Sequence, residues 1–325
     1  MMSRTHFSIL AVVLLVDTGC SQRDPAIARP EAIFGALDIS LLNEMAARQV
    51  APALGSLMVK FTDPGTSVPF ALPQCTGIQI GRRQVLTAGH CDRPKDYVFS
   101  KNRIARPEDS GKIEISTIGP DLRLTFSGEL IASEIGDEGQ VPTASPAIFK
   151  DTELDVAIIE FPYDLPPGWL DLRGTVDDLS SLVHFGYPNG LPLAISTGCH
   201  GLGTSSEAHF RHDCDSMTGS SGGLIIDARS GRPVGMQLAA PGFNLSDFYL
   251  QNKHFESPED FAARRGCSHT AFPNANDYAG CVQTRGLNAA VRLSSVAAAV
   301  AQQNPDLWAR LTVVQSSECN DRAMP

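Results

Sequence analysis

The sequence predicts a mostly β protein, either a barrel or a sandwich. From Leu54 onward, short apolar segments alternate with turns, and no helical pattern separates one segment from the next. Gly and Pro account for 28 and 22 of the 325 residues, which suits many turns better than a helical bundle. Lys and Arg total 26 against 36 Asp and Glu, and this net charge of −10 argues against non-specific nucleic-acid binding.

The first twenty residues read as an export signal. A short basic region precedes an apolar run of about ten residues, which is too short for a membrane span, and small residues follow it. Gly19-Cys20-Ser21 resembles a bacterial lipoprotein processing site, in which Cys20 is acylated, although Asp17 stands where that site usually has Leu. An ordinary cleaved signal and a retained segment are the alternatives. The expected location is the periplasm, the cell envelope as a lipoprotein, or the cell exterior.

The remaining elements follow in chain order. Residues 21–53 are expected to form an N-terminal tether, with one amphipathic helix over residues 33–48. Strands are predicted over residues 55–61, 77–86, 156–161, 182–187, 224–226 and 234–238. Residues 241–285 are polar and irregular, and they are interpreted as an insertion. The Ala- and Val-rich segment 293–302 is predicted to be a helix, with Ser294 or Ser295 as its N-cap and Pro305 just beyond its end.

The cysteines also favour export. None of the eight lies in a Cys-x-x-Cys unit, so neither a zinc ribbon nor a redox motif is expected, and no metal site is predicted. Three local pairs each close a loop of about 15 residues, and each disulfide would contribute about 3 kcal/mol in an oxidising compartment. The pairs are Cys75 with Cys91, Cys199 with Cys214, and Cys267 with Cys281. Cys20 remains for acylation, and Cys319 is left as a lone thiol near the C-terminal end.

The first segment that carries chemistry is Val85–Cys91. An apolar strand runs into small residues and then into His90. A disulfide from Cys91 back to Cys75 would clamp the loop on which this histidine lies. Histidine titrates near neutral pH and can serve as a general base, although a lone histidine after a strand is more often structural.

The second segment is Leu154–Glu160, in which Asp155 opens a continuous apolar strand. A carboxylate at the mouth of a buried strand needs a partner, because burying it unpaired is costly, and an imidazole would satisfy it. The plainer interpretation of Asp155 alone is a turn residue.

The third segment is Asp213–Ile226, in which glycines flank a serine pair just before an apolar strand. Glycine allows a tight turn whose backbone N–H groups converge, as an oxyanion hole requires. Ser221 would be exposed at this turn. The motif alone is only moderately specific, since Gly-Ser turns are common.

Together the three segments resemble the chymotrypsin/trypsin-like serine proteases, in a form close to the bacterial glutamyl-endopeptidase-like branch. The matching stretches are Thr87-Ala88-Gly89-His90-Cys91, Asp155-Val156-Ala157-Ile158 and Gly219-Ser220-Ser221-Gly222-Gly223. The resemblance covers about residues 54–310, which are expected to form the protease domain, followed by a tail over 311–325. It implies an all-β fold of two antiparallel six-stranded β-barrels with a C-terminal helix and with the site between the barrels.

The resemblance also implies the roles of the residues. Ser221 would attack the peptide carbonyl, His90 would accept and later return the proton, and Asp155 would fix the imidazole tautomer. The N–H groups of Gly219 and Ser221 would form the oxyanion hole. Ser220 stands where members activated by trimming usually have Asp, so that activation switch is not expected.

The resemblance leaves the substrate preference open. Asp215 lies six residues before Ser221, where trypsin-like enzymes place the Asp that attracts Arg or Lys at P1. Gln237 stands where the glutamyl-specific branch tends to carry His, which weakens an acidic preference, and a small or apolar preference is the third reading. Gly286 is expected on the other wall of the pocket.

The leading hypothesis is therefore a serine endopeptidase that acts on protein or peptide substrates as a monomer and without a cofactor. A catalytically silent homologue that binds proteins through its cleft is the main alternative, and an α/β-hydrolase esterase is a weaker one, because that fold needs its acid and histidine after the serine. His209 and His212 are expected in a surface loop rather than in a metal site.

Overall fold

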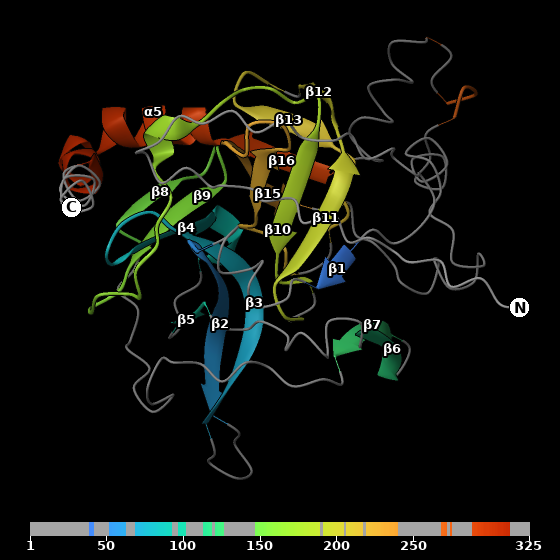
Figure 1. Cartoon of the computed structure of the whole chain (residues 1–325), viewed down its shortest axis with the longest axis horizontal. Coiled ribbons are helices and arrows are strands. Elements are labelled where there is room, and N and C mark those ends of the chain that lie inside the picture. The colour runs from blue at the N-terminus through green and yellow to red at the C-terminus, as the bar shows by residue number, and fades with distance from the viewer. Residues whose placement is uncertain are drawn as a thin grey trace, which may run out of the picture.

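The structure is a computed structural model. It describes residues 39–41, 52–62, 69–92, 97–101, 113–118, 121–126, 147–188, 191–204, 206–216, 219–239, 268–271, 274 and 288–312. These residues form two antiparallel sheets beside each other, with a helix near the C-terminal end (Figure 1). The predicted chymotrypsin-like fold of two β-barrels with a C-terminal helix is confirmed. No helix in this part of the chain is long and apolar enough to span a membrane.

The first sheet has six strands, as predicted. They are β2 (Leu54–Thr62), β3 (Pro69–Gln79), β4 (Gln84–Ala88), β5 (Tyr97–Ser100), β8 (Phe149–Asp151) and β9 (Val156–Glu160), in the order β5-β2-β3-β4-β9-β8. The single strand predicted over residues 77–86 is in fact the end of β3 and the first three residues of β4. The chain reverses between them, and the Ile80 N–H donates to the Gln84 carbonyl oxygen at 2.9 Å.

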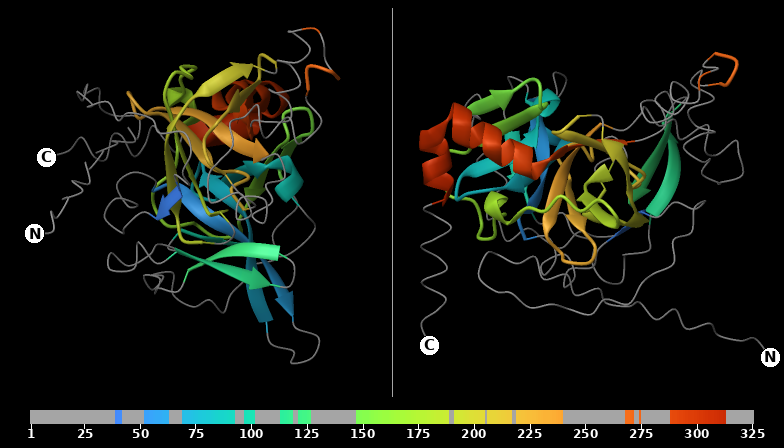
Figure 2. Two further views of the ribbon diagram at one scale, coloured as in Figure 1. Left: turned by 90° about the vertical axis from the view of Figure 1, so that its right-hand side faces the viewer. Right: turned by 90° about the horizontal axis from the view of Figure 1, so that it is seen from above.

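The second sheet has eight strands, two more than predicted. They are β1 (Ile39–Leu41), β10 (Leu182–Gly186), β11 (Ala194–Cys199), β12 (Gly201–Thr204), β13 (His209–His212), β14 (Leu224–Asp227), β15 (Pro233–Ala239) and β16 (Asn288–Arg292). Their order is β1-β11-β10-β14-β15-β16-β13-β12. A separate hairpin pairs β6 (Ile113–Ile118) with β7 (Asp121–Phe126). Figure 2 shows this hairpin to one side of the two sheets.

Strand β1 corrects the expectation for the N-terminal segment. The helix predicted over residues 33–48 is wrong at residues 39–41, which pair antiparallel with β11 in the register Ser40 to Ile195. Leu41, one of the apolar residues of this segment, is therefore buried at the edge of the second sheet and not on a helix face. The predicted tether over residues 21–53 thus contains a strand of the second sheet.

One apolar core joins both sheets and the helix. Its members include Ile78, Leu86 and Ile158 from the first sheet, Met236 from the second, and Val300 from the helix. All five side chains are fully buried. Because each strand places alternate side chains on one face, the inner faces of the two sheets meet in this core, and it fixes how the sheets lie against each other.

The predicted C-terminal helix is confirmed as α5 (Leu293–Gln303), which lies across one end of the sheets (Figure 1). Neither predicted serine is its N-cap. That position is Arg292, whose side chain makes no capping hydrogen bond, because β16 runs directly into the helix. Beyond α5, residues 305–312 are again helical. The break is at Asn304, whose side chain accepts a hydrogen bond from the Leu307 N–H at 3.1 Å.

Candidate active site

His90 and Asp155 are brought together by the pairing of two buried strands. β4 and β9 run antiparallel, and Ala88, the last residue of β4, pairs with Val156, the first of β9. The residues just beyond these strand ends therefore face each other. His90 lies in a single 3-10 turn after β4, and the Gly89 N–H donates to the Asp155 carbonyl oxygen at 2.7 Å.

Asp155 holds His90 through both of its carboxylate oxygens. His90 Nδ1 lies 2.8 Å from Asp155 Oδ2, and the His90 backbone N–H donates to Oδ1 at 2.9 Å. Because a carboxylate only accepts, Nδ1 carries the proton of the neutral ring, and Nε2 keeps a lone pair. About half of the His90 side chain is exposed, so this lone pair can reach a substrate or a nucleophile.

The backbone of Asp155 and the residue before His90 both have unusual requirements. Asp155 has a φ of 54°, which is uncommon outside glycine. A Cβ atom on Gly89 would lie 2.9 Å from Asp155 Oδ1. The absence of a side chain at Gly89 therefore allows the carboxylate to approach the backbone of the histidine turn.

Ser221 lies in a tight turn that precedes β14. Gly219 and Gly222 have φ angles of 96° and 87°, and the Gly223 N–H donates to the Ser220 carbonyl oxygen at 2.8 Å. Of the two adjacent serines, Ser220 is buried and Ser221 is half-buried. Only the second therefore presents its side chain near the surface.

The structure pairs His90 with Asp155 but not with Ser221. Among the described residues there is no hydrogen bond between the His90 ring and the Ser221 hydroxyl. The serine turn is instead tied to the first sheet through its backbone, since the Thr76 N–H donates to the Ser221 carbonyl oxygen at 2.8 Å.

Two of the three predicted disulfides are confirmed. Cys75 is bonded to Cys91, next to His90, and Cys199 is bonded to Cys214. The sulfur atoms of Cys75 and Cys91 and a ring nitrogen of His90 lie within 4.8 Å of one another, but the disulfide leaves no thiolate to ligate a metal. The predicted pair Cys267 and Cys281 lies outside the described residues, as do Cys20 and Cys319.

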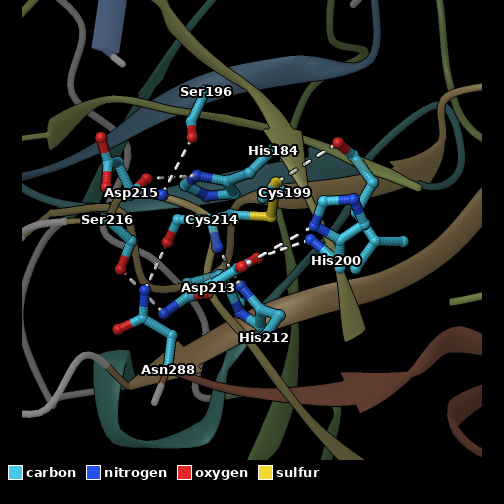
Figure 3. Close-up of a disulfide and its surroundings, with 12 residues drawn as sticks. His184, Ser196, Cys199, His200, His212, Asp213, Cys214, Asp215, Ser216 and Asn288 are labelled. Carbon is cyan, nitrogen blue, oxygen red and sulfur yellow. Dashed lines mark hydrogen bonds and ion pairs between the residues drawn. A yellow bond between two sulfur atoms is a disulfide. The ribbon is translucent and has the colours of Figure 1, made fainter. Parts of the chain in front are cut away.

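The Cys199–Cys214 disulfide fixes the segment that carries Asp215 (Figure 3). The Asp215 N–H donates to Ser196 Oγ at 2.9 Å, and the Asp215 carbonyl oxygen lies 3.2 Å from His184 Nδ1. Figure 3 shows the Asp215 carboxylate directed away from Asn288. The backbone of the predicted specificity residue is therefore held on both sides.

Gln237, which the sequence places near the pocket, and Asn288 both contact this segment. Gln237 Nε2 donates to Ser216 Oγ at 3.0 Å, and Asn288 Nδ2 donates to the Cys214 carbonyl oxygen at 2.5 Å. β15 and β16 thus both contact the segment 214–216. Gly286 lies outside the described residues.

Two buried histidines, His184 and His212, support this segment, and no sequence motif marks His184. Desolvation lowers the pKa of His184 to about 4 and that of His212 to about 3, so both rings are neutral at pH 7. The Cys214 N–H donates to His212 Nδ1 at 3.2 Å, so the ring proton of His212 is on Nε2. The His184 Nδ1 atom faces a carbonyl oxygen and carries the proton instead.

The placement of His209 and His212 in a surface loop is wrong. Residues 209–212 form β13, in which Phe210 and His212 point into the interior. Burial alternates along this strand, but Phe210 is the one apolar residue of the four, so the sequence carries no alternation of apolar side chains that would have revealed it.

The fold and the paired His90 and Asp155 define a two-barrel, chymotrypsin-like protein. Residues 75–236 match the family model described as a trypsin-like peptidase domain, and the chain belongs to this family of serine proteases. The comparison with curated proteins found no match.

Several solved structures are weakly similar. The inactive form of the protease Rv3671c is 13% identical with a TM-score of 0.40, covering 80% of this chain and 92% of that one. Its active form from M. tuberculosis is 15% identical with a TM-score of 0.35, covering 66% and 84%. The HtrA-type protease AlgW with a decapeptide is 13% identical with a TM-score of 0.45, covering 81% and 67%. Likeness at this level adds nothing to the family assignment.

Proposed function

We propose that the chain is a serine endopeptidase that cleaves peptide bonds through an acyl-enzyme on Ser221. The observation that carries this proposal is that two hydrogen bonds join His90 to the Asp155 carboxylate. Both residues lie in the part of the chain that matches the trypsin-like peptidase family. A carboxylate that fixes Nδ1 leaves Nε2 as the base, and that tautomer is the one a serine nucleophile needs.

The reaction proceeds in two halves. The Ser221 Oγ bonds to the carbonyl carbon of the substrate while its proton passes to His90 Nε2. The same proton then goes to the leaving amine as the peptide C–N bond breaks. Water repeats the sequence: its oxygen attacks the acyl carbon, its proton goes to His90, and the Ser221 oxygen leaves with that proton.

The negative oxygen of each tetrahedral intermediate needs donors that are already in place. The N–H groups of Gly219 and Ser221 are proposed for this role, and neither donates to another group among the described residues. The positive φ of Gly219 supports a turn in which two such groups converge.

A fluorophosphonate probe tests the nucleophile directly. The full chain, Ser221→Ala and Ser220→Ala are labelled side by side, and the last variant is the matched control because it removes the neighbouring hydroxyl. We expect labelling of the wild type and of Ser220→Ala, and none of Ser221→Ala. If the folded wild type stays unlabelled, the protein is not an active serine protease and a silent binding homologue becomes the better reading.

The proposed substrate preference is for Arg or Lys at P1, attracted by the half-buried Asp215. The test compares the wild type with Asp215→Ser on a peptide library in which the P1 residue is varied. We expect kcat/KM for basic P1 residues to fall in the variant while other residues are cleaved as before. A wild-type preference for small, apolar or acidic residues would contradict this role for Asp215.

Export remains part of the proposal. Residues 1–20 are proposed as the signal and Cys20 as the acylated residue, with residues 241–285 as an insertion in the protease domain and residues 311–325 as a tail. Mass spectrometry of the N-terminal peptide from the membrane fraction tests this. A diacylglyceryl group on Cys20 is expected, and an unmodified N-terminus in the soluble fraction would indicate an ordinary cleaved signal.

A further inference from the structure

We infer that Thr76 is a positioning residue, which sets the serine turn in register with His90. This inference rests on the proposed function, because it assigns how the nucleophile is held. Thr76 lies on β3 in the first sheet and its side chain is fully buried. The turn that it contacts lies 143 residues further along the chain and belongs to the second sheet.

Every polar group of Thr76 forms a hydrogen bond, and two of these bonds go to the serine turn. Its N–H donates to the Ser221 carbonyl oxygen at 2.8 Å, and its hydroxyl donates to the Gly219 carbonyl oxygen at 2.9 Å. The same hydroxyl accepts from the Tyr187 N–H at 3.0 Å, and the Thr76 carbonyl oxygen accepts from the Thr87 hydroxyl at 2.8 Å. Because a hydroxyl has one proton, the Tyr187 N–H fixes which way that proton points, namely toward Gly219.

Thr76 therefore holds both ends of the segment Gly219–Ser221. These are also the two residues whose N–H groups are proposed to bind the oxyanion. A carbonyl oxygen that is fixed on one side of a peptide plane fixes the N–H of that same plane on the other side. The contact of Thr76 with the Gly219 carbonyl thus sets the Gly219–Ser220 peptide plane, and its contact with the Ser221 carbonyl sets the Ser221–Gly222 plane. The Ser221 N–H belongs to the peptide between these two planes and is confined from both sides, whereas the Gly219 N–H belongs to the peptide just before them.

The serine turn packs closely against Thr76 at Gly222. A Cβ atom added to Gly222 would collide with the Thr76 carbonyl oxygen and would lie 2.6 Å from Thr87 Oγ1. Gly222 also has a φ of 87°. Glycine at this position is therefore needed both for the turn and for its approach to the Thr76–Thr87 pair.

A disulfide links Thr76 to the turn that holds His90, the proposed base. Cys75 precedes Thr76, Cys91 follows His90, and the two cysteines are bonded to each other. The stretch from His90 through the disulfide to Thr76 and on to the Ser221 carbonyl is short and fully connected. A shift of the serine turn against Thr76 is consequently a shift of the nucleophile against the base, and such a shift lowers kcat more than it alters substrate binding.

Three variants of the full chain test the inference. Thr76→Val keeps the shape and removes the hydroxyl, Thr76→Ser keeps the hydroxyl, and Ser56→Ala is the matched control. Ser56 is buried on β2 directly opposite Thr76, and its hydroxyl has no partner among the described residues. We expect Thr76→Val to lower kcat and the rate of fluorophosphonate labelling by up to about 10²-fold with KM little changed. Thr76→Ser restores most of the rate, and Ser56→Ala is unchanged.

The inference is overturned if Thr76→Val, folded by circular dichroism, labels as fast as the wild type while Ser221→Ala does not label. Absence of labelling in the wild type would instead count against the proposed function. If Thr76→Val does not fold, Thr87→Val decides, because it removes the hydrogen bond to the Thr76 carbonyl oxygen. A lower kcat with an unchanged pH profile supports the inference, since the profile reports the His90–Asp155 pair, and a wild-type kcat overturns it.

Discussion

The two halves of the proposed active site are held by different kinds of contact. His90 and Asp155 lie at the ends of two neighbouring strands of one sheet, and the register of Ala88 with Val156 sets their geometry. Ser221 belongs to the other sheet, and its turn reaches the first sheet through Thr76. The acid and the base are thus aligned by strand pairing, whereas the nucleophile is aligned by a contact between sheets.

The two kinds of contact differ in how readily a substitution can shift them. Strand pairing over five successive residue pairs resists small shifts, because a slip would turn every side chain to the opposite face. A contact between sheets depends on a few hydrogen bonds and on close packing. Substitutions of His90 or Asp155 should therefore alter proton transfer without moving the backbone. Substitutions at the contact between Thr76 and the serine turn should instead displace Ser221 relative to His90.

Loss of the Asp155 carboxylate, which holds His90 within one sheet, should reduce activity most. Asp155→Asn keeps the shape of the side chain, but its amide can donate to Nδ1 and so favour the tautomer with the proton on Nε2. We expect kcat to fall by about 10⁴-fold, measured with a cleaved peptide. Asp92→Asn, close to His90 but paired with Lys150, is the control and should keep its rate. Similar losses in both variants would show that the effect is not specific to the carboxylate that holds His90.

The two disulfides of the described residues lie in different halves of the site, so their removal should have different effects. Their sequence separations are 16 and 15 residues, so removing either by paired Ser substitutions should lower the free energy of unfolding by about 3 kcal/mol. Only the Cys75–Cys91 bond joins the neighbours of His90 and Thr76. We therefore expect its loss to lower kcat, and loss of Cys199–Cys214 to change KM instead. Equal effects on kcat, measured below the unfolding temperature of both variants, would contradict this division.

Acid should weaken the second sheet through its buried histidines. The folded pKa values of His184 and His212 lie below the usual 6.5, so the unfolded chain binds protons that the folded chain does not. Stability is complete above pH 6.5 and falls as the pH decreases toward 4. Between pH 6.5 and 5 the two rings together should cost about 3 kcal/mol, measured by urea unfolding. His212→Gln should reduce this dependence by about half, and an unchanged pH dependence in this variant would argue against a buried neutral ring.

A contact remote from the site should matter least. Gln303 Nε2 donates to Asp151 Oδ2 at 2.8 Å and connects α5 to β8. Because this bond is exposed, Gln303→Ala should lower the free energy of unfolding by at most about 1 kcal/mol and leave kcat unchanged. A change in kcat would show that α5 also contributes to the alignment of the two sheets.

The sequence predicts best what depends on neighbouring residues. The strand after Asp155 and the Ala-rich helix are local patterns of apolar residues, and both are found close to their predicted positions. The loops closed by Cys75–Cys91 and by Cys199–Cys214 are local as well. Short separation along the chain is what makes such features visible without a structure.

The features that the sequence does not reveal depend on contacts between distant segments. Thr76 is an unremarkable strand residue until its partners at Gly219 and Tyr187 are known, and they lie 143 and 111 residues away. His184 is a single polar residue in an apolar strand, yet its ring contacts the backbone carbonyl oxygen of Asp215. Burial of such side chains is decided by how the two sheets meet, which no local pattern encodes.

Strand β1 has a consequence for where the chain can be shortened. Its three residues cover the backbone groups along the outer edge of β11. Removing everything before residue 54, where the protease resemblance begins, would leave that edge open. An open strand edge is a template for pairing with another molecule, so the shortened protein should aggregate through β11, whereas a chain that starts before Ile39 keeps its edge covered.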